Sequence, residues 1–195
     1  MTALLAALSL VLAMIPPGID LIPRGEEEES ARPVSIEERL EQRLADLAEA
    51  PSEQAGEAIA EEVRSLWRQS GGATAQLLLD RAERALAEND RATAERQYAH
   101  LRRLEPEFAE GWFASAQLAI ARGQWDFALD ALTETVSLEP RRFDAYALLG
   151  RALERASEPR AALAAYEEAL RVHPWHAQAR QARARLEDQL AGRAL

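Results

Sequence analysis

The chain has 195 residues and a formal net charge of −10, and all 23 of its basic residues are arginine because the sequence contains no lysine. Without cysteine it can form no disulfide framework, no thiolate metal site and no cysteine nucleophile. An acidic chain also lacks the clustered positive surface of a general nucleic-acid-binding protein, so we expect no nucleic-acid partner. Alanine occurs 41 times, and because alanine, leucine, arginine and glutamate are strong helix formers, the composition favours an all-α fold.

The apolar run at residues 3–15 is typical of an exported protein. As a helix it would span about 20 Å, which is short of the ~30 Å core of a bilayer but suits the apolar region of a signal peptide. No basic residue precedes the run, and no convincing cleavage site follows it. We therefore expect residues 1–17 to be a signal peptide or a short membrane anchor, and the protein to be periplasmic or membrane-anchored facing the periplasm. The alternative, an ordinary N-terminal helix of a cytoplasmic protein, is weaker because the run has no polar face to show to water.

Residues 18–34 are rich in proline and glutamate, and we expect them to form a linker. Residues 35–70 carry two amphipathic stripes, which a break at Pro51 separates. The stripes are formed by Ile36, Leu40, Leu44 and Leu47, and by Ile59, Val63, Leu66 and Trp67. Ser35 and Glu38 match a capping box at the start of the first stripe. We expect a helical hairpin that caps the first of the repeats described next, or a degenerate extra repeat.

Residues 75–176 repeat with a period of 34 residues. The columns that recur at this interval are Pro106, Pro140 and Pro174; Asn89, Gly123 and Ser157; Ala82, Ala116 and Gly150; and Ala94, Ala128 and Ala162. Each proline ends a helix, because it lacks an N–H and disfavours helix at the residue before it. The second column falls where a first helix must end, and asparagine and glycine tolerate left-handed backbone there. The small residues suit close helix crossings, so each period predicts two packed helices joined by a turn.

This pattern resembles the tetratricopeptide repeat (TPR) family, whose unit is a helix–turn–helix hairpin of 34 residues. The third repeat matches best, through Tyr146, Leu149, Gly150, Leu153, Ala162, Tyr166, Ala169 and Pro174. The resemblance implies an all-α fold, a right-handed α-solenoid of TPR repeats at 75–108, 109–142 and 143–176. It also implies flanking capping helices, the last of them at 177–190, because a solenoid must cover its terminal apolar face.

Two repeats depart from the family pattern. The second carries Ala119 where a large apolar residue is usual, and Leu118 or Ile120 could fill that space. The first is the loosest, because Arg81 and Ala85 replace apolar residues. The chain is also similar to small exported TPR proteins of GC-rich bacteria, and the absence of lysine fits such a genome.

In the TPR family the first helix of each repeat lines a concave groove, so the resemblance implies a scaffold that binds a segment of a partner protein there. The columns assign to this groove Gln76, Leu79, Glu83, Glu110, Phe113, Gln117, Ile120, Asp144, Ala147, Arg151, Glu154, Arg155, Gln178, Gln181 and Arg185. Phe113, together with Arg151 and Arg155, is the expected anchor, because aromatic and arginine side chains dominate binding hot spots. The alternative is that Phe113 packs on a neighbouring helix. The Lys/Asn/Arg clamp by which some members hold chaperone termini is not expected, since the chain has no lysine.

We expect no catalytic residue, no cofactor and no metal. The chain has neither a phosphate-binding glycine loop nor a nucleophile elbow. His173 and His176 could suggest a metal site, but such a site needs at least three protein ligands. The expected partner is a protein or peptide of unknown identity, with possible membrane association through the N-terminal segment and an open oligomeric state. The alternative function is a structural or assembly subunit of a membrane-associated complex, as in cytochrome biogenesis, or a self-associating solenoid.

Overall fold

The computed structural model describes residues 34–192, which form nine helices and no strand. The helices are α2 (Ile36–Ala48), α3 (Glu53–Gln69), α4 (Ala73–Ala87), α5 (Arg91–Leu104), α6 (Ala109–Ala121), α7 (Trp125–Leu138), α8 (Phe143–Arg155), α9 (Pro159–Val172) and α10 (Ala177–Gly192). The signal peptide or anchor predicted at 1–17 lies outside the described residues, as does the linker at 18–34 apart from Val34. Between residues 34 and 192, no helix combines the length and the apolar character needed to cross a bilayer.

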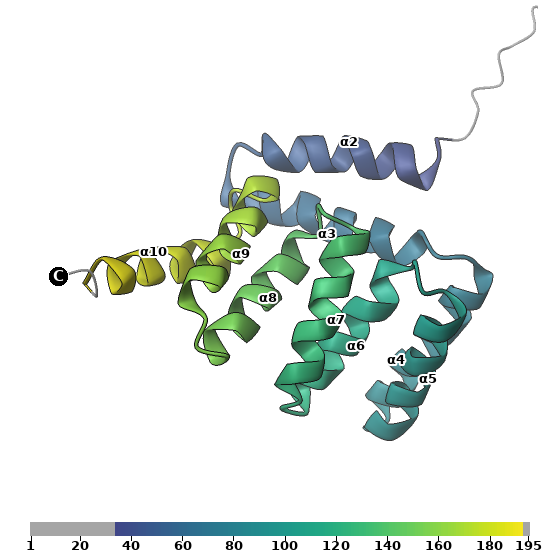
Figure 1. Ribbon diagram of the computed structural model, residues 1–195. Coiled ribbons are helices and arrows are strands. Elements are labelled where there is room, and N and C mark those ends of the chain that lie inside the picture. The colour runs from purple at the N-terminus through teal and green to yellow at the C-terminus, as the bar shows by residue number, and fades with distance from the viewer. Residues whose placement is uncertain (1–33, 193–195) are drawn as a thin grey trace, which may run out of the picture. The chain divides into compact units, whose positions relative to one another are not determined.

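Six of these helices form three hairpins, α4 with α5, α6 with α7, and α8 with α9 (Figure 1). The second helices of the hairpins start at Arg91, Trp125 and Pro159, which keeps the 34-residue interval of the sequence. Neighbouring hairpins pack through α5 on α6 and through α7 on α8, and α10 packs on α9. The predicted all-α solenoid of helix–turn–helix units is therefore confirmed.

The turn inside each hairpin uses left-handed backbone at the column that the sequence predicted. The angle φ is +60° at Asn89, +73° at Gly123 and +64° at Ser157. The N–H of the following residue then donates to a carbonyl at the end of the first helix, as from Gln124 N to Ala119 O at 2.9 Å. These bonds satisfy carbonyl groups that a helix end leaves without a partner.

Small residues lie where the two helices of a hairpin cross, which confirms the role assigned to them. Ala82, Ala94, Ala116, Ala128, Ala162 and Ala169 are all 0% exposed. At Gly150 a Cβ would come within 2.8 Å of the Tyr166 ring, so the ring fills the space that glycine leaves. The abundance of alanine is thus partly a matter of position in the solenoid and not only of helix propensity.

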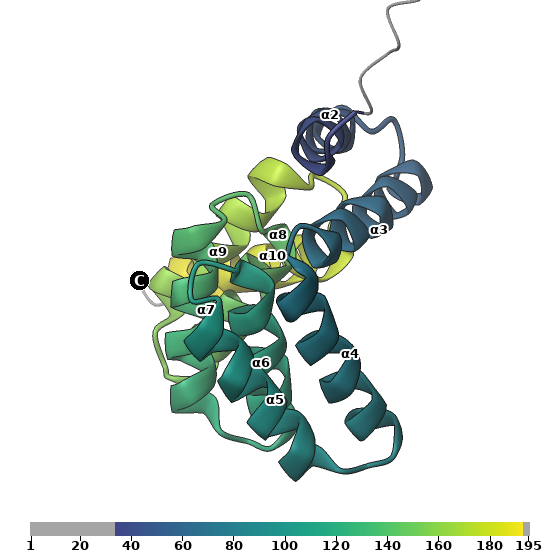
Figure 2. The same cartoon turned by 90° about the vertical axis from the view of Figure 1, so that its right-hand side faces the viewer.

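The hairpin of α2 and α3 does not stack on the first repeat, and the prediction of a cap or degenerate repeat at that end is wrong. Its apolar stripes pack on Phe143 of α8 and Val172 of α9, which belong to the third repeat. Figures 1 and 2 show α2 and α3 along one edge of the solenoid. The physical reason is that Phe143 and Val172 offer an apolar surface to these stripes, and both become buried there.

Polar contacts fix the hairpin in this place. The indole Nε1 of Trp175 donates to the carbonyl of Ala50 at 2.7 Å, and Nη1 of Arg141 lies 2.7 Å from a carboxylate oxygen of Glu41. At the start of α2, Ser35 and Glu38 form the predicted capping box, with both reciprocal hydrogen bonds present. The N-terminal hairpin therefore spans from the start of α4 to the third repeat.

Candidate ligand-binding groove

Helix α3 crosses the inner face of the solenoid, which α6, α8 and the start of α10 form. Where it crosses, the guanidinium of Arg142 lies between two rings, 4.6 Å from the centroid of Trp67 and 4.1 Å from that of Phe113. Nη2 of Arg142 is 2.7 Å from a carboxylate oxygen of Glu110, and Nε is 2.9 Å from a carboxylate oxygen of Asp144. We call these five side chains the Arg142 cluster.

Two carboxylates pair with the buried Arg142, although its Nη1 has no hydrogen-bond partner among the described residues. Arg142 is 1% exposed, and burial on its own lowers the pKa of its guanidinium. The carboxylates of Asp144 and Glu110 outweigh this effect and raise that pKa, so the side chain stays charged. The charge of Arg142 is thus engaged by two carboxylates and two aromatic rings of the protein itself.

The cluster overturns the prediction that Phe113 and Glu110 contact a partner. Each is 5% exposed, and Arg142 stacks on the ring of Phe113 and pairs with Glu110. The alternative interpretation of Phe113, packing on a neighbouring helix, is the correct one, because Phe113 shares a buried cluster with Leu132 of α7 and Ala145 of α8. The expected aromatic anchor is thus already occupied by the protein's own side chains.

Beside the Arg142 cluster, α3 and the inner helices enclose a cavity of about 330 Å³. Of the residues assigned to the groove, those that line it are Glu110, Phe113, Gln117, Asp144, Ala147 and Gln178. The remaining lining residues are Glu61, Arg64, Arg68, Arg142, Leu148 and His176. Arg64 lies 2.8 Å from Glu57 and 3.0 Å from Glu61, so this cation on the α3 side of the cavity is paired within its own helix.

The three residues assigned to the groove on α4 are engaged within the protein. Leu79 is 2% exposed and belongs to the core of the first repeat, so its assignment as a partner contact is wrong. Glu83 forms an ion pair with Arg68 of α3, and the amide of Gln76 donates to the carbonyl of Arg68. The reason is again α3, which lies on the side of α4 that a partner segment was expected to reach.

Arg151 and Arg155 remain open at the far end of α8. Both are exposed, and their guanidinium carbons lie 5.7 Å and 4.9 Å from the ring centroid of Trp125. Among residues 34–192, no carboxylate pairs with either of them. These two cations are therefore oriented by an aromatic ring and free to bind an anionic group.

The other predicted residues near this end have partners or lie apart. Two nitrogens of Arg185 lie 2.7 Å and 3.0 Å from the Glu154 carboxylate, and the Tyr166 hydroxyl donates to Glu154 at 2.8 Å. These bonds join α8 to α10, and the bond from Arg185 lowers the pKa of Glu154. Ile120 is half-buried and packs against the core of the second and third repeats. Gln181 is exposed on α10.

Sequence reasoning missed the contribution of α3 and of Arg142. Arg142 sits just before α8, where an arginine is ordinarily solvated, and nothing in its neighbours indicates burial. The sequence places Trp67 in an apolar stripe, but such a pattern does not indicate the surface against which the stripe packs. The available signal was Phe143, a large apolar residue at the repeat boundary for which the columns provided no packing role.

His173 and His176 have a structural role at this edge. Their ring centroids lie 5.1 Å and 6.0 Å from that of Phe143, under the N-terminal hairpin. Burial, together with the neighbouring His176, lowers the pKa of His173 to about 4, so its imidazole is neutral at pH 7. Within residues 34–192, no group of three or more His, Asp and Glu side chains is arranged to hold a metal ion.

Comparisons with known proteins agree with this fold. No family model matches the chain. A TPR repeat-containing protein of Rhizobium etli is 28% identical over 158 residues, which cover 81% of this chain and 78% of that protein. The first TPR of Spaghetti (RPAP3), solved with the HSP90 peptide SRMEEVD, has a TM-score of 0.58 at 17% identity and covers 62% of this chain and 96% of that one. MamA has a TM-score of 0.56 at 19% identity, covering 66% of this chain and 74% of its own.

The 34-residue columns, the left-handed turns and these likenesses agree on one class of molecule, an α-solenoid of helix–turn–helix repeats. The chain has the fold of the TPR domains among these solved structures, and its sequence is similar to a TPR repeat-containing protein. At these sequence identities the likeness to the solved structures extends to the fold and not to the arrangement around Arg142.

Proposed function

We propose that the chain is a non-catalytic protein-interaction scaffold that binds an acidic segment of a partner protein along α8, from the cavity beside α3 to the C-terminal end of that helix. The observation that carries this proposal is the pair of exposed cations Arg151 and Arg155, which have no carboxylate partner within residues 34–192. The exposed amides of Gln117 and Gln178 line the adjoining cavity and can bind the backbone of an extended segment.

Three physical arguments support this assignment. The inner face of a solenoid is an extended surface suited to a polypeptide segment. The ring of Trp125 orders both guanidinium groups by cation–π contact, so less side-chain entropy is lost on binding. The TPR of Spaghetti, which has the same fold, was solved with a peptide that contains two adjacent glutamates.

The proposal is tested by selecting random peptides displayed on phage against the purified protein. We expect the selected peptides to be acidic, and the double variant Arg151→Glu/Arg155→Glu to bind them at least tenfold more weakly. Arg160→Glu is the matched control, because Arg160 is an exposed arginine on the outer helix α9. Selection of basic or purely apolar peptides, or equal binding by the double variant and the control, would contradict the proposal.

A structural or assembly subunit is the second candidate. It is favoured by exposed apolar side chains on the first two repeats, namely Leu77 at 45%, Leu104 at 55% and Phe127 at 40% exposure. Sedimentation separates the two candidates. A monomer at micromolar concentration supports the scaffold, whereas a concentration-dependent oligomer that Leu104→Gln dissolves supports self-association.

We further propose that the protein is exported, on the strength of the apolar run at residues 3–15. The test is fractionation of cells that express the full chain or a variant lacking residues 1–17. Export predicts that the full chain is found in the periplasmic or membrane fraction and that the shortened chain stays in the cytoplasm. Identical fractionation of the two would contradict it.

A further inference from the structure

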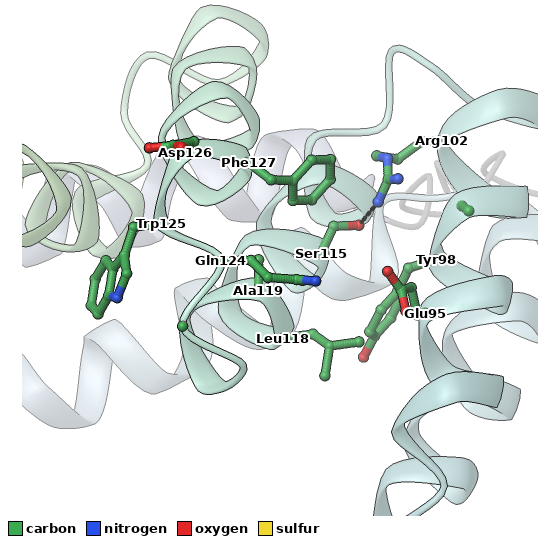
Figure 3. A pocket seen from close by; sticks show the side chains of 12 residues that line it. Glu95, Tyr98, Arg102, Ser115, Leu118, Ala119, Gln124, Trp125, Asp126 and Phe127 are labelled. Atoms are coloured by element: carbon green, nitrogen blue, oxygen red, sulfur yellow. Dashed lines mark hydrogen bonds between the residues drawn. The ribbon is translucent and has the colours of Figure 1, made fainter.

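A second cavity lies away from the inner face, between the outer helices α5 and α7, with α6 as its floor (Figure 3). Its volume is about 510 Å³, which is within the range of small-molecule sites. The residues that line it are Glu95, Tyr98, Ala99, Arg102, Ser115, Leu118, Ala119, Gly123, Gln124, Trp125, Asp126 and Phe127. None of the residues assigned to partner binding contributes to it.

Ala119 forms part of the floor of this cavity. In the third repeat the same column is occupied by Leu153, which packs against the core beside Tyr166. At Ala119 this side chain is missing, and the two residues that could have replaced it do not. Leu118 forms a wall of the cavity, and Ile120 packs elsewhere in the core. The small side chain of Ala119 therefore leaves room on the floor of the cavity.

Arg102 lines this cavity and forms no ion pair with a carboxylate of residues 34–192. Arg102 donates from Nη1 to the Ser115 hydroxyl, which in turn donates to the carbonyl of Gly111 at 2.6 Å. Its guanidinium carbon lies 5.4 Å from the ring centroid of Trp112 and 5.0 Å from that of Phe127. Burial lowers the pKa of Arg102. No carboxylate among residues 34–192 forms an ion pair with it, although the charge of Glu95 offsets part of the effect of burial on its pKa.

The acidic residues at the rim do not neutralise Arg102. Glu95 forms its ion pair with Arg122. The carboxylate of Asp126 points away from the space, as does the ring of Trp125, whereas the amide of Gln124 reaches into it (Figure 3). The cavity thus combines the cation of Arg102, the amide of Gln124 and the polar side chains of Glu95, Tyr98 and Ser115 with apolar walls.

We propose that this cavity binds a small amphiphile, an apolar chain that carries a single carboxylate. The carboxylate pairs with the Arg102 guanidinium and accepts a hydrogen bond from the Gln124 amide, and the apolar chain lies against Leu118, Ala119 and Phe127. A carboxylate suits Arg102 because the planar guanidinium still has free N–H groups beyond the one bound to Ser115. A single charge suits the rim, since the further carboxylates of an acidic polypeptide would approach Glu95 and Asp126.

The probe is decanoate, titrated below its micelle concentration into the purified protein and followed by calorimetry. Decyltrimethylammonium has the same chain with the opposite charge and serves as the ligand control. Ala119→Leu fills the cavity and leaves Arg102 in place, whereas Arg102→Gln removes the cation and leaves the space. Ala161→Leu makes the same change at an exposed position of α9 and is the matched protein control.

We expect decanoate to bind with one-to-one stoichiometry and the cationic probe to bind at least tenfold more weakly. Ala119→Leu should weaken decanoate binding at least tenfold, and Arg102→Gln should remove the preference for the anion. Amide resonances of residues 98–102 and 115–127 should shift on binding, which places the ligand independently of any change in stability. Absence of binding at millimolar decanoate, equal binding of the two probes, or unchanged binding by Ala119→Leu would overturn the proposal.

Discussion

Replacement of Arg142 by methionine should destabilise the protein strongly, although the residue lies in a loop between two repeats. The change removes the cation from two carboxylates at 2.7 Å and 2.9 Å and from two ring faces, at a site where Arg142 is 1% exposed. Removal of one partner from a buried ion pair costs about 3–5 kcal/mol, because the remaining charge is left without compensation. In a chain of this length that loss corresponds to a decrease in Tm of roughly 6–20 °C.

The matched control is Arg141→Met, one residue earlier. Arg141 pairs with Glu41 and Glu139 at a side-chain exposure of 36%, so its removal should cost at most about 1 kcal/mol. The double variant Arg142→Met/Glu110→Gln should recover part of the loss, since it also removes one of the two uncompensated carboxylates.

The assay is urea unfolding followed by circular dichroism, with equal helicity of the folded variants at low urea as the condition for comparison. If Arg142→Met costs no more than Arg141→Met, then α3 does not close over the inner face and the Arg142 cluster is wrong. If the double variant is less stable than Arg142→Met, then the uncompensated charge on Glu110 is not the cause of the loss.

Three further predictions concern packing and pH. Gly150→Ala places a Cβ within 2.8 Å of the Tyr166 ring and should cost about 1–3 kcal/mol in thermal unfolding, so an unchanged Tm would refute the described crossing. Ala128→Leu introduces a larger side chain at a position of 0% exposure and should cost a similar ~1–3 kcal/mol, whereas Ala164→Leu at an exposed position should be nearly neutral. The pKa of His173 is lowered from 6.5 to about 4 in the folded protein. Between these two pH values the unfolded chain binds more protons than the folded chain, so the stability should fall as the pH decreases. The loss attributable to His173 should be about 1–2 kcal/mol between pH 7 and 5, and His173→Gln should reduce it; an identical pH dependence of variant and wild type would refute this assignment.

The repeat array could be predicted because each of its features depends on residues close in sequence. Asn89, Gly123 and Ser157 determine the turns through their own backbone preferences. Ala128 and Gly150 determine helix crossings within single hairpins. These interactions are local, and the 34-residue period shows each of them several times over.

The position of the N-terminal hairpin could not be predicted, because its apolar stripes have no preference among apolar surfaces. Trp67 contacts Phe143 at a centroid distance of 5.4 Å, although the four helices α4 to α7 separate the two residues in the sequence. No local rule selects that partner. The prediction of the site failed for the same reason: the groove columns correctly place Phe113 on an inner helix, but they hold no information about the Arg142 side chain that stacks on its ring.

The contacts of Trp175 with Ala50 and of Arg141 with Glu41 have a consequence for how the protein unfolds and how it can change over evolution. An open solenoid behaves as a one-dimensional array in which repeats fray from either end and can be added or lost singly. Here the N-terminal hairpin of α2 and α3 acts as a brace, because it runs from the start of the first repeat to the third. The ends of the array cannot separate unless the contacts of this hairpin with the third repeat break. Unfolding should therefore be cooperative over residues 36–192. Insertion or deletion of one 34-residue unit inside the array would move the third repeat away from the brace, so the length of this solenoid is fixed by its own N-terminal hairpin.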